Sequence, residues 1–573
     1  MLIQSSLESL PSHTMQCFQI PASVSHKLDQ IHRDFFWKKS NSEKGLPMVA
    51  WDKICRPKKL GGLGLRKTRA VNTAFVAKLS WKFLTQSNNY WVKQMRAKYC
   101  SPDSFFQYKK KQTDSWAWRC MIRAREFVKR GIRWTVGNGH TISFWLDSWC
   151  HELPLIELFD PGPSDTDRSQ VKVCEFITPE KVWDTAKLSQ VLPQHLVKLV
   201  LAVPIPMTYM EDSFCWGFTG SGDFTTKSAT WRAHDNIQHD QASWKFNWIW
   251  KLDVMPKIRI FLWQLCHNAL PTRAALLRKG LYIDPVCPAC LSEIEDMDHL
   301  FVGCHMVKKI WDLAVSQKWL LSQPFPPSSP SVREGLHSLY NAGDTYLQRV
   351  AILLWSIWKS RNALVFDNAD PKPVGTLIRA KRIWAEWKLR TSVFHPHSIH
   401  LQINPPTPKT TQLIGWRSPP GGYIKLNFDG THSSHGAAAG FVIRDWVGRF
   451  LQAGTRFLEG ASILVAEATA MRDGIQAALA TGCRQLIVEG DNKVVIQAIQ
   501  GQILIPWQIQ PLLRDIQNMI PPSVHCLFQH TYREGNLAAD WWQSMVVLFE
   551  YRLLFLFPSL LIRILFLFLC TTS

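Results

Sequence analysis

Three cysteines and one histidine in the middle of the chain constrain its fold most strongly. They form the series Cys287-Pro-Ala-Cys290, then His299 after eight residues, then Cys304 after four more. Two thiolates in a tight turn, an imidazole and a third thiolate satisfy the tetrahedral coordination that Zn²⁺ prefers. Because the protein fills all four positions, we predict one structural Zn²⁺ rather than a catalytic one. Free thiols that share this spacing by chance are the alternative.

The remaining cysteines fit a reducing compartment. The whole chain has 14 cysteines, scattered from Cys17 to Cys570, and only the predicted zinc series is compact. The first twenty or so residues lack the charged start and apolar run of a secretory signal peptide. We therefore expect an intracellular protein, in the nucleus or the cytoplasm, where clustered cysteines bind metal more often than they form disulfides.

The charge of the chain indicates a polyanionic partner. A length of 573 residues allows several domains, each with its own core. The 66 Lys and Arg outnumber the 45 Asp and Glu, which gives a net charge of +21 at pH 7. Such an excess attracts polyanions, and nucleic acid is the commonest of them. A generally basic surface without a partner is the alternative.

Basic and aromatic side chains alternate between about residues 70 and 135. The cations could meet phosphates while the aromatic rings stack on bases. Equally, the rings could form a core beneath solvated helix faces, and the sequence leaves both interpretations open. The residues concerned are Lys78, Trp81, Lys82, Trp91, Lys93, Arg96, Lys98, Lys109 to Lys111, Trp116, Trp118, Arg119, Arg123 and Arg125.

A buried strand near the C-terminal end of the chain finishes in a carboxylate. From Ile424 to Asp429 apolar and polar residues alternate, which predicts a strand with one buried face and Asp429 at its polar end. A single Asp at a strand end is usually a turn former, so its meaning depends on whether other carboxylates join it.

Three further carboxylates follow in comparable positions. A helix predicted over 464–480 carries Glu467 at the edge of its apolar stripe, where an unpaired charge would be costly. A second apolar strand ends in Asp491, and a later loop leads to Asp540 at the start of a helix. Four such groups could surround a pair of hydrated Mg²⁺ ions, which prefer oxygen ligands and keep several waters.

The pieces around these carboxylates resemble a plant-type ribonuclease H domain. They are Asp429-Gly, Ala466-Glu467-Ala468, Glu489-Gly-Asp491 and Arg533-Glu-Gly-Asn536…Ala539-Asp540. The resemblance implies a mixed sheet flanked by helices and an endonuclease that cleaves the RNA strand of RNA–DNA hybrids by two-metal hydrolysis. It assigns the Mg²⁺ ligands to Asp429, Glu467, Asp491 and Asp540, and it places an assisting histidine at His530.

Other segments extend the resemblance. Residues 248–311 look like the zinc-binding module that follows reverse transcriptase in plant non-LTR retrotransposons, with its Leu-Pro-Thr-Arg, Cys-Pro-x-Cys and His-Leu-Phe-x-x-Cys pieces. Residues 1–150 are similar to the region after the polymerase palm of those elements. The chain has no Tyr-x-Asp-Asp polymerase motif and no endonuclease region of such an element. It resembles their C-terminal part, and a polymerase domain encoded upstream is a candidate partner.

The predicted fold is multidomain. Mostly α-helical N-terminal and zinc-binding regions precede an α/β ribonuclease H-like domain with a mixed sheet flanked by helices. In the connector we expect short strands, including a hairpin over 214–224. The predicted domains are a post-polymerase helical region (1–150), a connector (151–240), the zinc-binding module (241–320), a helical and proline-bearing linker (321–420), the ribonuclease H-like domain (421–543) and an aberrant apolar tail (544–573).

The tail raises doubt about activity. Charged residues and a proline interrupt it, so no uncharged run reaches the roughly 18 residues of a membrane span. We expect translated non-coding sequence there, with a membrane anchor as the less favoured alternative. The family continues after its last Asp as an amphipathic helix, whereas this chain departs soon after Asp540. A catalytically inactive nucleic-acid-binding relic is therefore the alternative to an active enzyme.

Overall fold

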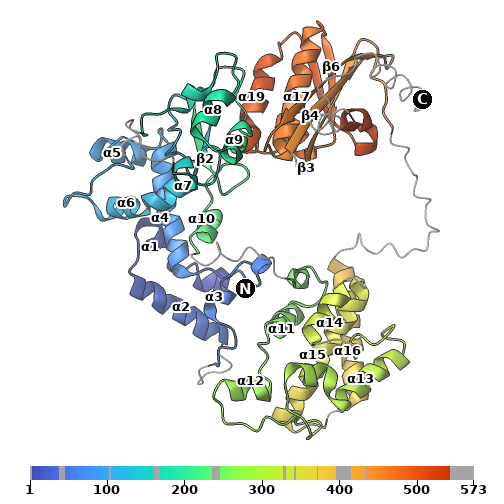
Figure 1. Ribbon diagram of the computed structural model, residues 1–573. Helices are drawn as coiled ribbons and strands as arrows, with labels where there is room; N and C mark the ends of the chain where they lie inside the picture. Colours follow the sequence, from blue (N-terminus) through green and yellow to red (C-terminus); the bar gives the residue numbers. More distant parts are fainter. Residues whose placement is uncertain are drawn as a thin grey trace. The chain divides into compact units, whose positions relative to one another are not determined.

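The chain forms two compact units, and Figure 1 shows the computed structural model. One unit contains residues 1–76 and 230–410, and the other contains residues 77–229 and 411–573. The predicted tail lies outside the described residues. Among the helices that the structure describes, none combines the length and the apolar character that crossing a membrane requires. The structure describes residues 3–37, 45–101, 105–160, 168–234, 245–326, 331–340, 343–370, 372–394, 415–433 and 436–541.

The first unit is helical and contains the cysteine–histidine series. Its core joins α11, α13, α15 and α16 around buried residues such as Phe261, Phe301 and Trp311. Its helices are α1 (Ser12–Cys17), α2 (Ala22–Trp37), α3 (Trp51–Ile54), α11 (Pro256–Cys266), α12 (Arg273–Arg278), α13 (His305–Ser316), α14 (Val332–Leu339), α15 (Asp344–Asp367) and α16 (Pro373–Phe394), with 3-10 turns at Lys58–Leu60 and Asn247–Trp250 and π-helical turns at Ile3–Leu7 and His299–Gly303.

The N-terminal segment packs against α11 within this unit. Trp263 is fully buried, and its Nε1 donates a hydrogen bond of 2.8 Å to the carbonyl oxygen of Gly61. The region predicted as a single piece over 1–150 is therefore divided between the two units, with the change at residue 76.

A buried ion pair ties the zinc-ligand segment to α15. The Arg361 guanidinium donates to both carboxylate oxygens of Glu295, at 2.7 and 2.6 Å. Glu295 is 0% exposed and also accepts from the backbone N–H of Arg273 at 2.8 Å. Such a two-pronged pair is directional, and removal of one partner leaves a buried charge without compensation.

The second unit begins with helices and a small two-stranded ribbon. In the ribbon β1 (Ile132–Thr135) pairs antiparallel with β2 (Ser213–Trp216). Of the predicted hairpin over 214–224 only the first arm is a strand, and it pairs with β1, about 80 residues earlier. The second arm is not a strand, although the N–H of Trp216 donates 2.7 Å to the carbonyl oxygen of Gly222. The helices before the sheet domain are α4 (Thr68–Thr85), α5 (Tyr90–Lys98), α6 (Trp116–Gly131), α7 (Leu155–Leu158), α8 (Thr185–Val191), α9 (Gln194–Leu201) and α10 (Thr226–Arg232), with a 3-10 turn at Val173–Phe176; α4 and α10 contain the unit boundaries.

A turn of this unit binds a carboxylate of its own chain. The oxygens of Asp212 accept hydrogen bonds from the backbone N–H groups of Gly137, Gly139 and Thr141, at 2.8, 2.8 and 2.9 Å. The backbone N–H groups around Gly137-Asn-Gly139 therefore form a concave anion-binding turn, or nest. By binding Asp212, this turn holds the end of β1 beside the start of β2.

The C-terminal part is a five-stranded mixed sheet with helices, as predicted. The strand order is β5-β4-β3-β6-β7, in which β3, β4 and β5 pair antiparallel while β6 is parallel to both β3 and β7. Helices α17 and α19 lie beside the sheet (Figure 1). Buried side chains of the sheet and of both helices form one core. The elements are β3 (Ile424–Ser433), β4 (Gly436–Arg444), β5 (Phe450–Leu458), α17 (Ile463–Ala480), β6 (Gln485–Gly490), α18 (Lys493–Ile499), α19 (Gln510–Met519) and β7 (His525–His530), with 3-10 turns at Trp507–Ile509 and Arg533–Gly535.

We expect Arg361→Met to lower the free energy of unfolding of the first unit by about 3–5 kcal/mol, because it strands the buried Glu295 carboxylate. Urea titration followed by tryptophan fluorescence measures the change. The matched control is Arg382→Met, whose exposed ion pair with Glu386 contributes roughly 0–1 kcal/mol. Equal destabilisation by the two variants would contradict the anchoring role of Arg361.

Candidate functional site

Two parallel strands bring two of the predicted carboxylates to one edge of the sheet. In the register of β3 and β6, Asn427 lies opposite Glu489. Asp429 and Asp491 each follow two residues later, so they lie side by side just past the paired part of the two strands. The predicted strand end at Asp429 was wrong, because β3 continues to Ser433 in its pairing with β4. Glu467 joins them from α17, and these three residues offer ligand atoms that all lie within 4.8 Å of one another.

A glycine allows the helix to approach closely enough. A Cβ atom at Gly430 would lie 2.4 Å from the backbone nitrogen of Glu467, which is well inside a steric clash. The residue directly after Asp429 must therefore lack a side chain for α17 to place Glu467 beside the strand. Gly490, directly before Asp491, is constrained similarly, since its Cβ would lie 2.4 Å from the Phe428 ring.

The last two predicted site residues lie at the margin of this cluster. A side-chain hydrogen bond joins Asp540 to Asp429, but Asp540 is not among the three residues that share the 4.8 Å cluster. Arg533 Nη2 lies 3.5 Å from Asp540 Oδ1. The exposed His530 ring places Nε2 at 3.1 Å from the carbonyl oxygen of Asp491.

The electrostatics of the cluster fit a divalent cation. Burial, and then repulsion from Asp491 and Asp540, raises the pKa of Asp429 to about 8. Burial, and then repulsion from Asp429 and Asp491, raises the pKa of Glu467 to about 9. Oε2 of Glu467 is buried and has no hydrogen-bond partner among the described residues. An all-oxygen donor set with crowded negative charge and an unsatisfied acceptor suits Mg²⁺.

A polar network behind the cluster was missed by the sequence reasoning. Asn536 is 1% exposed, and its Nδ2 donates 2.8 Å to the carbonyl oxygen of Phe428, the residue before Asp429. Its backbone oxygen accepts from the N–H of Asp540 at 3.2 Å. Asn536 therefore connects the strand that carries Asp429 to the turn that carries Asp540.

The same network reaches the residues that precede the sheet. Asn427 donates to Asn536 Oδ1 at 3.3 Å and accepts from Trp416 Nε1 at 2.9 Å. Lys425, also on the polar face of β3, donates 2.8 Å to Glu489. The alternation of β3 could have indicated these positions, because Lys425, Asn427 and Asp429 share one face. Their partners Glu489 and Asn536 could not have been found in this way, since they lie 64 and 109 positions away along the chain.

The predicted zinc ligands are brought together in the first unit. Cys287, Cys290, His299 and Cys304 offer ligand atoms that lie within 4.8 Å of one another. The imidazole Nδ1 of His299 donates 2.7 Å to a carboxylate oxygen of Glu293. That bond leaves Nε2, which lies 3.3 Å from Cys290 Sγ, to face the thiols.

The thiols differ in how readily they lose a proton. The hydrogen bond with Cys287 lowers the pKa of Cys304 to about 7, and the same bond, with burial, raises the pKa of Cys287 to about 12. Two neighbouring thiols thus share a proton that a cation would displace. Three sulfurs and one imidazole nitrogen are the donor set of a structural zinc site.

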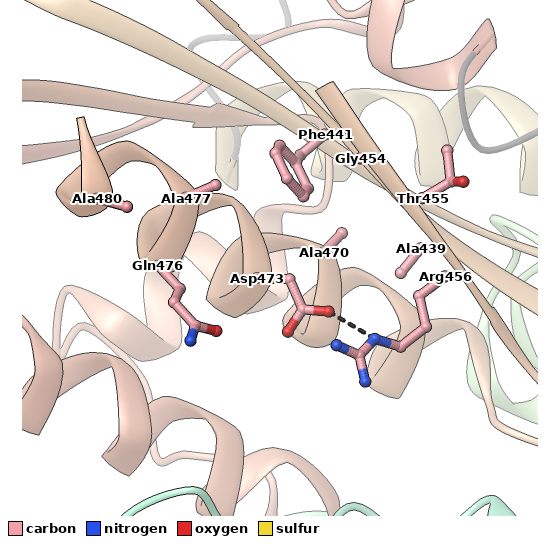
Figure 2. A pocket seen from close by; sticks show the side chains of 10 residues that line it. All are labelled: Ala439, Phe441, Gly454, Thr455, Arg456, Ala470, Asp473, Gln476, Ala477 and Ala480. Carbon is pink, nitrogen blue, oxygen red and sulfur yellow. Dashed lines mark ion pairs between the residues drawn. The ribbon is translucent and has the colours of Figure 1, made fainter. Parts of the chain in front are cut away.

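The cavity in Figure 2 is separate from both clusters. It has a volume of about 300 Å³ and lies between α17 and strands β4 and β5. Small side chains line most of it, and the ion pair of Arg456 with Asp473, at 2.7 Å, crosses one side. None of the predicted carboxylates is among the described residues that line it. The carboxylate cluster instead lies at the edge of the sheet.

We expect one tightly bound zinc ion per chain, lost in the double variant Cys287→Ser with Cys290→Ser, because two of four ligands are removed. Elemental analysis of the purified protein measures the zinc content. The matched control is Cys483→Ser with Cys526→Ser in the sheet domain, which should keep the zinc. A folded parent protein without zinc would refute the assignment.

We expect the Mg²⁺-free protein to lose stability as the pH rises from about 5 to 9. Asp429 and Glu467 hold protons in the folded state up to pKa values of about 8 and 9, whereas unfolded Asp and Glu have pKa values of about 4. Unfolding therefore releases protons in this range, and the free energy of unfolding falls as pH rises.

Thermal unfolding midpoints across this pH range test that expectation. Asp429→Asn should flatten the dependence, and Asp445→Asn, in the turn between β4 and β5, should leave it unchanged. A slope that is identical in all three proteins would show that the cluster carries no excess protons.

Two family models match the chain. One, described as reverse transcriptase-like, covers residues 427–546, and it includes the carboxylate cluster. The other, described as zinc-binding in reverse transcriptase, covers residues 224–311, and it includes the cysteine–histidine cluster.

Individual proteins are similar over different lengths. An Arabidopsis thaliana protein with the provisional name ribonuclease H protein is 29% identical over 557 residues, which are 94% of this chain and 87% of that protein. An uncharacterised mitochondrial protein of Arabidopsis thaliana is 32% identical over 149 residues, which are 26% of this chain and 97% of that protein. The crystal structure of ribonuclease H1 from Halobacterium salinarum is 21% identical, with a TM-score of 0.21, and the match covers 22% of this chain and 98% of that one.

The two family matches occur in the same order as the two clusters of the structure. The chain therefore contains a zinc-binding reverse-transcriptase module followed by a reverse transcriptase-like domain of the ribonuclease H type.

Proposed function

We propose that this protein is a ribonuclease H-type endonuclease that hydrolyses the RNA strand of RNA–DNA hybrids with two Mg²⁺ ions. The observation that carries the proposal is the cluster of Asp429, Glu467 and Asp491, whose ligand atoms lie within 4.8 Å of one another. It lies in the segment that matches the reverse transcriptase-like family. Asp540, hydrogen-bonded to Asp429, is the proposed fourth ligand.

The residues of the site have separable roles in this proposal. When bound, the metal ions would supply an activated water and neutralise charge on the scissile phosphate. Asp429 and Glu467 hold protons at neutral pH without metal and exchange them for a cation, since burial and then repulsion raise both pKa values. His530 is exposed beside Asp491, where its imidazole can pass a proton to solvent.

The zinc module has a structural role in the same proposal. Cys287, Cys290, His299 and Cys304 would hold one ion, with no ligand position left for a substrate. In small zinc fingers such binding contributes on the order of 10 kcal/mol to folding. Loss of this ion should therefore unfold the segment around it. The zinc site itself takes no part in catalysis in this proposal.

An inactive nucleic-acid-binding relic is the second candidate. The position of Asp540 favours it, because this residue is not part of the 4.8 Å cluster and lies 3.5 Å from the guanidinium of Arg533. An Asp540 that stays paired with Arg533 would leave the metal site one ligand short.

Cleavage of a hybrid labelled on its RNA strand separates the two candidates. With Mg²⁺ we expect endonucleolytic products from the full-length chain. Because loss of a metal ligand removes several kcal/mol of transition-state stabilisation, Asp429→Asn should slow cleavage by on the order of 10²–10³-fold.

The matched control is Asp445→Asn, which keeps the oxygen that accepts from the N–H groups of Val447 and Arg449. It should cleave at the rate of the parent. Absence of cleavage by the parent, or cleavage that Asp429→Asn leaves unchanged, would reject the enzyme and favour the relic.

A further inference from the structure

The positive charge of the second unit is divided unevenly. Residues 415–541, which carry the carboxylate cluster, contain ten Lys or Arg and ten Asp or Glu, so this domain has no net charge. Residues 77–131 contain 13 Lys or Arg and three Asp or Glu, a net charge of +10. These 55 residues thus hold nearly half of the +21 of the whole chain. A neutral domain with an acidic site attracts a polyanionic duplex poorly.

The cations of the basic segment are available to a ligand. Two of its acidic residues are already engaged, since Asp114 is buried and accepts from Tyr108 and Glu126 lies 3.6 Å from Arg125. Most of the basic side chains point to solvent from α5, α6 and the loop between them. The exposed cations include Lys93, Lys98, Lys109, Lys110, Lys129 and Arg130.

Most aromatic residues of this segment form its core, whereas Tyr90 and Trp116 are exposed. Trp118 is 0% exposed and stacks on Tyr99 with ring centroids 4.4 Å apart. Trp81 packs edge-on against Phe214 and Trp216 of β2, at 5.8 and 5.5 Å. Rings in such positions cannot serve as platforms for bases. Of the two interpretations that the sequence left open, the structure supports cations over an aromatic core, and a surface of this kind contacts phosphates rather than bases.

The basic segment is connected to the sheet domain by packing as well as by the chain. The core of α4 and α6 includes Ile132 of β1, with Phe214 and Phe224 packed against it. The turn after β2 then contacts the segment before α19, where the backbone N–H of Trp507 donates 3.2 Å to the carbonyl oxygen of Gly220.

A buried carboxylate fastens the connector to the helices of the sheet domain. Asp515 of α19 is 0% exposed and accepts from the N–H groups of Met207 and Thr208 at 2.8 and 2.9 Å. Arg472 of α17 lies 3.3 Å from Asp515 and also donates to the carbonyl oxygen of Ile205 at 3.4 Å. Because a buried charge is costly to separate from its donors, these bonds hold the connector against the sheet domain.

A second contact supports this attachment at the start of α17. Lys198 Nζ of α9 lies 2.8 Å from the carboxylate of Glu459. A Cβ at Gly460 would lie 2.8 Å from the carbonyl oxygen of Lys198, so the two backbones approach closely. The connector thus contacts both ends of the segment 459–472, within which Glu467 lies.

We propose that residues 77–131 are the phosphate-binding surface for the duplex on which the carboxylate cluster acts, and that the connector over 132–220 holds this surface in a fixed relation to the sheet domain. That the duplex is an RNA–DNA hybrid rests on the proposed function. Because the surface contacts phosphates, binding is independent of base sequence and sensitive to salt.

The test measures hybrid binding separately from cleavage. In the full-length Asp429→Asn background with Mg²⁺, Lys93, Lys109, Lys110 and Lys129 are all changed to Gln. Fluorescence anisotropy with a labelled hybrid should show an affinity lower by on the order of tenfold or more at 0.1 M salt. The slope of log affinity against log salt should fall by roughly 0.7–0.9 for each lysine that contacts a phosphate.

The matched control carries four exposed Lys→Gln changes in the first unit, at 251, 257, 279 and 308. It loses the same charge, so it should reveal any effect of net charge alone. Circular dichroism of both variants checks that they are folded. Equal affinity of the two quadruple variants would overturn the proposal. So would loss of binding to phosphatidylserine vesicles without loss of hybrid affinity, since the surface would then be a membrane site.

A cleavage assay distinguishes this proposal from the proposed function. It uses the same four Lys→Gln changes in the protein that keeps Asp429. Weakened binding with no cleavage by any protein supports the surface and rejects the enzyme. Cleavage with an unchanged KM supports the enzyme and rejects the surface. Cleavage with a raised KM and an unchanged kcat supports both, because lost phosphate contacts weaken substrate binding without altering the reacting groups.

Discussion

The candidate site depends on the parallel pairing of β3 with β6. That pairing places Asp429 and Asp491 at one edge of the sheet, and Gly430 lets α17 add Glu467 to them. The resulting crowding of carboxylates is unfavourable without a counter-charge, as the raised pKa values of Asp429 and Glu467 show. The fold keeps this arrangement because the strands and the helix are fixed by a large apolar core on the other side of β3.

The second unit combines two regions with opposite electrostatic character. One is a neutral domain with a concentrated acidic site, and the other is a strongly basic helical segment. A site that holds metal ions must be acidic, whereas a surface that holds a nucleic acid must be basic. In the function we propose, separate regions joined by the connector satisfy both requirements, and the buried Asp515 fastens the connector to the sheet domain.

In the zinc-binding module, too, two different features have separate roles. Its four candidate ligands are close in sequence and need only a local turn to meet. The module is attached to the rest of its unit by the pair of Glu295 with Arg361, which are 66 residues apart. The proposed metal coordination would account for the local shape, and the buried ion pair accounts for the attachment of the module to α15.

The sequence by itself predicted the cysteine–histidine cluster through short ligand spacing and the basic character of residues 77–131 through composition. It predicted the mixed sheet and its carboxylates through the resemblance of several short pieces to a ribonuclease H domain, because their spacing along the chain does not show that they meet. Only the tertiary structure decided that β2 pairs with β1, that Trp118 and Trp81 are core residues, and that Asn536 links the turn before Asp540 to β3. It also decided that the connector is fastened to α19, through Asp515 and residues about 300 positions earlier. Such contacts join segments that lie far apart along the chain, and no local pattern specifies which distant residue a buried polar group will bind.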